Sequence, residues 1–145
     1  MTLYYLGSQK DVDLKVVSDI SASHLEILRG EEITLGGLGY FTKERPKVVF
    51  LRAEYSTLVD QFYRILTEEL AEFRKEDADG DFCGHVTLGR LRTEESVREF
   101  LDQRERLERM CSTKRLYFPI REVGIYVLQD KVLPSVQKLW RKFEF

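Results

Sequence analysis

His85 and Thr87 are the residues best suited to chemistry, and they stand two positions apart in the stretch GHVTLGR at 84–90. Successive side chains of a strand point to opposite faces. A strand here therefore places His85 and Thr87 on one face and points Val86 and Leu88 into the core. An imidazole transfers protons near neutral pH, and a hydroxyl hydrogen-bonds an anionic oxygen. The pair suits the chemistry of phosphate esters.

Two arginines follow this pair, Arg90 and Arg92. A guanidinium near an imidazole and a hydroxyl gives a site able to hold a phosphate. The alternatives are structural: His85 bonded to a neighbouring backbone group, and Arg90 solvated at the end of a strand.

Other motifs have ordinary structural interpretations. The sequence GGLG at 36–39 lacks the spacing of a nucleotide loop and predicts a tight turn whose glycines permit positive φ. His24 is expected to be a cation at the end of the first helix, where the helix dipole favours it. The acidic residues of 77–81 resemble a calcium loop, but its twelfth position falls on Leu88, which excludes an EF-hand.

Composition predicts one domain spanning 1–145, with 43% apolar and 33% charged residues. A formal net charge of -2 gives no overall positive field to attract nucleic acid or an anionic membrane. Cys83 and Cys111 lack metal-ligand spacing and predict a reduced pair in the cytoplasm. No apolar run is long enough to cross a bilayer, and no signal peptide is expected.

Hydrophobic periodicity predicts alternating helices and strands. Helices are expected at 11–23, at 57–73 and from an N-cap at Thr93, with Glu94 and Glu95 in its first turn. Strands are expected at 2–6, 25–28, 32–35, 48–51, around His85, and as a pair at 115–118 and 121–128, while 132–145 fits either state. The alternation indicates an α+β or α/β sandwich with a mixed sheet.

Three predicted helices have apolar stripes, and the stripe of the helix that begins at Thr93 consists of Val97, Phe100, Leu101, Leu107 and Met110. In the first, Val16 and Val17 belong to the stripe. In the second, helical spacing relates Leu58, Phe62, Ile65, Leu66, Leu70 and Phe73.

The stretch FCGHVTLGR at 82–90 resembles the second signature of the 2H phosphoesterase superfamily. The branch it resembles is the RNA 2',3'-cyclic phosphodiesterases, also called LigT-like 2'-5' RNA ligases. In that branch TLYYLG at 2–7 matches the tail of the first signature, and LGGLGYF at 35–41 matches a glycine-rich segment. The next strand (46–51) and the long helix (57–73) follow in the family's order, so the resemblance covers roughly 1–92.

The resemblance implies a two-lobed, pseudo-symmetric α+β fold with two His-x-Thr motifs facing each other across a cleft. One histidine acts as general base and the other protonates the leaving oxygen, without a metal or cofactor. His85 and Thr87 would be catalytic, Thr2 and Arg90 would bind the substrate, and the partners would be RNA ends or cyclic nucleotides.

The sequence departs from this pattern at its first motif. With Thr2 aligned, Met1 takes the variable position and the first histidine would precede it. The N-terminal unit is therefore expected to be missing and hydrolysis impaired. A truncated or misassigned start is the favoured explanation; a natural half-site, or a first half supplied by another polypeptide, are the others.

Two further functional hypotheses remain at this point. A non-catalytic module that binds nucleotides or RNA ends would lose affinity in His85→Ala or Arg90→Ala and show no turnover. A structural domain would dimerise through an exposed strand edge.

Overall fold

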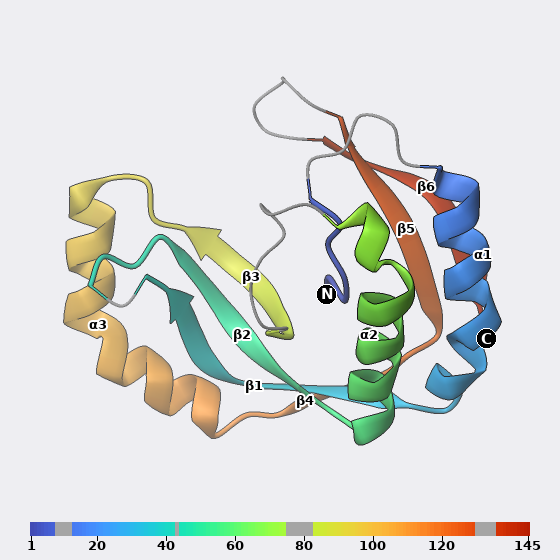
Figure 1. Cartoon of the computed structure of the whole chain (residues 1–145). Helices are drawn as coiled ribbons and strands as arrows, with labels where there is room; N and C mark the ends of the chain where they lie inside the picture. Colours follow the sequence, from blue (N-terminus) through green and yellow to red (C-terminus); the bar gives the residue numbers. More distant parts are fainter. Residues whose placement is uncertain (8–12, 43, 75–82, 130–135) are drawn as a thin grey trace. The chain divides into compact units, whose positions relative to one another are not determined.

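The computed structural model describes residues 1–7, 13–42, 44–74, 83–129 and 136–145. Its helices are α1 (Leu14–His24), α2 (Thr57–Glu69) and α3 (Glu94–Ser112), with short 3-10 helices η1 (Leu25–Leu28) and η2 (Ala71–Phe73). Its strands are β1 (Glu32–Phe41), β2 (Val48–Tyr55), β3 (His85–Arg90), β4 (Leu116–Pro119), β5 (Glu122–Gln129) and β6 (Val136–Glu144) (Figure 1). The predicted α+β class is confirmed.

The described residues form two compact units. The first unit contains residues 1–3, β1, β2, β3, α3 and β4 as far as Phe118. The second unit contains the described part of 4–31, α2, η2, β5 and β6. None of the helices in these described residues has the length and hydropathy of a membrane span.

The first unit is a four-stranded sheet covered on one face by α3. The strand order is β3-β2-β1-β4, and β2 runs antiparallel to both of its neighbours. Phe100 of α3 packs on Leu38 and Val49 and meets the Tyr40 ring edge-on at 5.6 Å. The opposite face of the sheet carries Phe50, which leaves that face for the candidate site.

The position of α3 follows from its N-terminal sequence. The Thr93 hydroxyl accepts a hydrogen bond from the Ser96 amide at 3.1 Å, and the Ser96 hydroxyl accepts one from the Thr93 amide. This reciprocal capping box satisfies two amides that a helix would otherwise leave unpaired. The predicted N-cap is confirmed, and Glu94 and Glu95 lie in the first turn as expected.

The second unit has a core around α2. Phe62, Val59 and Leu70 are almost fully buried, and the helix packs on η1, which buries Leu28. The antiparallel pair β5 and β6 belongs to the same unit, where an arginine of β6 donates a hydrogen bond to a serine hydroxyl of α1. The segment 132–145, which fitted either state, is therefore a strand over its described part.

Some predicted elements were wrong in type. Residues 2–6 lie in neither a helix nor a strand. Residues 25–28 form η1, because three residues per turn brings Leu25 and Leu28 to one side, where both are buried. The alternating faces of a strand would have separated these two leucines.

The glycine-rich segment 36–39 lies inside β1 and is not a tight turn. Gly36 pairs with Arg52 and Leu38 with Leu51, so Gly37 is the extra residue of a β-bulge. Its φ of 72° is the left-handed conformation that glycine adopts without strain. The strand continues through the segment and reaches Phe41.

The predicted pairing of 115–118 with 121–128 was also wrong, although both segments are strands. β4 joins the first sheet and β5 pairs with β6. Between them the Ile120 amide donates a hydrogen bond to the Glu31 carbonyl at 2.8 Å. The chain therefore does not form a hairpin after β4, and β5 does not pair with β4.

Most residues at the centres of the predicted apolar stripes are buried, but single members of the stripes are exposed. Val17 is buried, whereas Val16 is 38% exposed, and in α2 Leu58 is 41% exposed. Among the described strands, β3 and β4 are the outer strands of their sheet. Dimerisation through a strand edge stays a prediction.

Gly39 offers a sharp test of packing in the first sheet. A Cβ at this position would lie 2.2 to 2.9 Å from atoms of the Phe50 ring. Gly39→Ala must displace that ring, so we expect a loss of about 1–3 kcal/mol in the free energy of unfolding, measured by urea denaturation. Gly89→Ala is the matched control, because nothing lies within 4 Å of its added carbon. Equal losses in the two variants would contradict this account.

Candidate active site

β3 presents His85 and Thr87 on one face of the first sheet. His85 pairs with Arg52, and Thr87 pairs with Phe50. Residues that pair across antiparallel strands share a face. Because Phe50 and Arg52 are two positions apart on β2, their partners lie side by side on the face opposite α3. The predicted strand and the predicted juxtaposition of His85 and Thr87 are confirmed.

The immediate surroundings of His85 fix the roles of its ring nitrogens. Nδ1 lies 2.8 Å from the carbonyl oxygen of Cys83. A carbonyl only accepts hydrogen bonds, so Nδ1 carries the proton of the neutral ring. Nε2 is then the nitrogen that can accept a proton from a substrate.

Two phenylalanines hold the imidazole ring in place. The ring centroids of Phe41 and Phe50 each lie 5.0 Å from that of His85, and Phe41 meets it edge-on at 88°. The two phenylalanine rings also pack on each other at 4.5 Å. The histidine is half-buried against this aromatic pair, which restricts its rotation. A held ring is what a proton-transfer group requires.

A β-bulge at Leu88 changes which face the end of β3 presents. Val49 pairs with Gly89 and Phe50 pairs with Thr87, which leaves Leu88 as the extra residue. Leu88 is 56% exposed, so the prediction that it points into the core was wrong. The bulge shifts the alternation by one position.

The bulge brings Arg90 to the face of the histidine. Arg90 pairs with Val48, which lies on the same face of β2 as Phe50 and Arg52. Regular alternation from His85 would have placed Arg90 on the opposite face. His85, Thr87 and Arg90 therefore lie in one row along β3, with Thr87 and Arg90 exposed.

Arg52 is a candidate that the sequence analysis missed. It is the cross-strand partner of His85, and its Nε donates a hydrogen bond to the Leu38 carbonyl at 3.2 Å. Arg52 lies two positions from Phe50 on β2 and therefore on the same face of the sheet. This spacing in the sequence could have identified Arg52 as a candidate. The pairing with His85 depends on the register, which the sequence does not state.

Thr2 lies in the first unit, in an exposed segment without regular structure. The Met1 sulfur is 3.1 Å from the position that a Cβ would take on Gly84. This sulfur lies on the face of the sheet that carries Ala53, which is opposite to the face of His85. The role of Thr2 at the site of His85 stays a prediction.

His24 has a different environment. It ends α1 in the second unit, and its Nε2 lies 2.9 Å from a carboxylate oxygen of Glu69 in α2. Within the described residues, no three His, Cys, Asp or Glu side chains gather as a metal site requires. The row of His85, Thr87 and Arg90 offers proton transfer, a hydroxyl donor and a positive charge.

Comparison with known proteins relates most of the chain to one family. The family model described as the 2'-5' RNA ligase superfamily matches residues 1–131, which extends beyond the 1–92 segment of the sequence resemblance. The crystal structure of TT0787 of Thermus thermophilus is similar, with a TM-score of 0.61 and 22% sequence identity. That similarity covers 98% of this chain and 75% of the other, and it supports the fold. No curated protein matches significantly.

Proposed function

Because the chain belongs to the 2'-5' RNA ligase superfamily, we propose that it acts on RNA ends and hydrolyses 2',3'-cyclic phosphates. His85 is the proposed acid–base group, Thr87 and Thr2 bind phosphate oxygens, and Arg90 adds positive charge. The observation that carries this proposal is the hydrogen bond between His85 Nδ1 and the Cys83 carbonyl. It leaves Nε2 to transfer a proton beside the Thr87 hydroxyl.

Hydrolysis forms a bond from the water oxygen to phosphorus and breaks one of the two ring P–O bonds. The water gives a proton to a base, and the leaving ribose oxygen receives one from an acid. In-line displacement places these two oxygens on opposite sides of phosphorus. His85 therefore serves one of them, and its role as acid or base exchanges when the reaction runs as ligation.

Thr87 and Arg90 stabilise the phosphate in this scheme. The hydroxyl donates a hydrogen bond to a non-bridging oxygen, and the guanidinium offsets the negative charge. No metal ion takes part in the proposed chemistry. Arg52 adds a second positive charge on the same face, across from His85.

The proposed reaction needs a second proton-transfer group in addition to His85. A His-x-Thr triplet occurs once in the 145 residues, at 85–87. His24 does not replace the missing group, because Leu25 and Glu26 follow it.

The test compares two proteins on 2',3'-cyclic AMP: this chain and a version extended upstream of Met1 that restores a His-x-Thr triplet. We expect turnover about 10²–10⁴ faster in the extended protein, because it holds both proton-transfer groups. Equally fast turnover by the 145-residue chain would contradict the need for a second histidine. Binding without turnover in both proteins would make this a binding module, and absence of binding would overturn the phosphoesterase proposal.

A further inference from the structure

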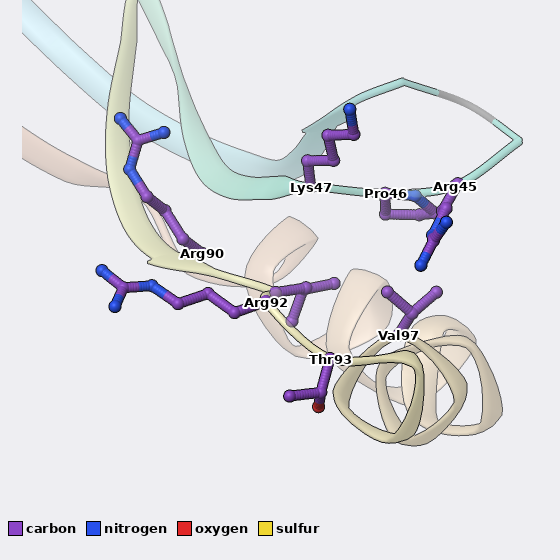
Figure 2. A pocket seen from close by; sticks show the side chains of 8 residues that line it. Arg45, Pro46, Lys47, Arg90, Arg92, Thr93 and Val97 are labelled. Atoms are coloured by element: carbon purple, nitrogen blue, oxygen red, sulfur yellow. The ribbon is translucent and has the colours of Figure 1, made fainter.

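A pocket of about 390 Å³ opens at the end of β3 in the first unit. Four cationic side chains line it: Arg45, Lys47, Arg90 and Arg92 (Figure 2). They come from two segments, the chain before β2 and the end of β3. The Leu91 amide joins these segments by donating a hydrogen bond to the Lys47 carbonyl at 2.9 Å.

The positive charge of this pocket is mostly uncompensated. Arg45 lies 3.3 Å from a carboxylate oxygen of Glu94. Within the described part of the chain, no carboxylate comes within ion-pair distance of Lys47, Arg90 or Arg92. The whole chain has a net charge of -2, so the cluster does not reflect a generally basic protein. The charged ends of these side chains point in different directions, so they present a basic surface around the pocket that attracts several separate anionic groups (Figure 2).

The side chains, and not the helix end, provide the attraction. The pocket lies at the start of α3, where Thr93 and Ser96 already satisfy each other's amides in the capping box. The walls add apolar surface from Pro46, which is buried. A volume of a few hundred Å³ accommodates a phosphate together with an attached sugar.

Arg90 connects this pocket to the candidate active site. It lines the pocket and also lies on the same face of the sheet as His85 and Thr87. Because of the bulge at Leu88, His85 and Arg90 pair with residues only four positions apart on β2, so at the rise of an extended strand they are separated by roughly 13 Å. A mononucleotide with its phosphate at His85 is too short to reach Lys47 and Arg92.

We propose that Arg45, Lys47 and Arg92 bind backbone phosphates of a single-stranded RNA whose cyclic end lies at His85. The inference rests on the proposed function and favours an RNA strand over a free cyclic nucleotide as its substrate. Backbone phosphates attract lysine and arginine without regard to sequence. The pocket therefore favours longer RNA strands and does not distinguish between bases.

The test uses the charge-reversed double variant Lys47→Glu/Arg92→Glu. Its matched control is Arg106→Glu/Arg109→Glu, which makes the same change in charge at exposed positions near the other end of α3. Fluorescence anisotropy measures binding of a labelled oligoadenylate that lacks a cyclic end. We expect the pocket variant to raise its Kd by about tenfold or more at low salt, and to reduce the slope of log Kd against log salt by about 1.4. The control should change Kd by less than about threefold.

A second measurement separates this proposal from the proposed function. Turnover of 2',3'-cyclic AMP by the extended protein should be the same with and without the pocket substitutions. Equal weakening by the pocket and control variants, or unchanged RNA binding in the pocket variant, would overturn the pocket proposal. Absence of cyclic AMP turnover in the parent protein would count against the proposed function alone, because the anisotropy assay needs no catalysis.

Discussion

Replacing His85 by alanine is expected to lower hydrolysis of 2',3'-cyclic AMP by about 10²–10⁴-fold in the extended protein. The substitution removes Nε2, the ring nitrogen that the hydrogen bond from Nδ1 to the Cys83 carbonyl leaves open for proton transfer. We expect the loss in kcat more than in KM, because Thr87 and Arg90 still bind the phosphate. Steady-state kinetics at a fixed pH measure both.

His24→Ala is the matched control for this substitution. It removes the other histidine of the chain, which pairs with Glu69 in the second unit, and activity should stay within about twofold. His85→Gln tests whether lost packing explains the loss, since glutamine fills space beside Phe41 and Phe50 but does not transfer protons. A Gln variant with nearly full activity would show that His85 is a structural residue.

The parts of the site that could be predicted from sequence are those set by local rules. Alternation along a strand places His85 and Thr87 together whatever strand lies beside them. The N-cap at Thr93 depends on neighbours within three residues, and its capping box confirms it. The match to the 2'-5' RNA ligase superfamily confirms the predicted superfamily, while the narrower phosphodiesterase branch stays a proposal.

The parts that could not be predicted depend on register between strands. The bulge at Leu88 exists because β2 offers one residue fewer than β3, and only that difference turns Arg90 toward the histidine. The same holds for Arg52, which meets His85 through pairing across strands. The separation of β4 from β5 also follows from pairing between distant segments, because β4 joins the sheet of β1 while β5 pairs with β6.

Phe62→Ala is expected to lower the free energy of unfolding by about 3–5 kcal/mol. The ring is 1% exposed in the core of the second unit, so its removal leaves a cavity that the neighbours fill only in part. Typical domains have a free energy of unfolding of about 5–15 kcal/mol, so this single change removes a large fraction of it. Urea denaturation followed by circular dichroism gives the difference, and a loss below about 1 kcal/mol would contradict the described packing.

Leu58→Ala is the control that makes this prediction specific to the structure. Leu58 and Phe62 are four positions apart on α2, and the sequence pattern assigns both to one buried stripe. In the structure Leu58 is 41% exposed, so its truncation should cost under about 1 kcal/mol. Helical spacing gives the angle of a residue around its helix, but not how much of the helix its neighbours cover. A large difference between the two variants therefore measures that coverage directly, and equal losses would mean that the stripe is buried along its whole length.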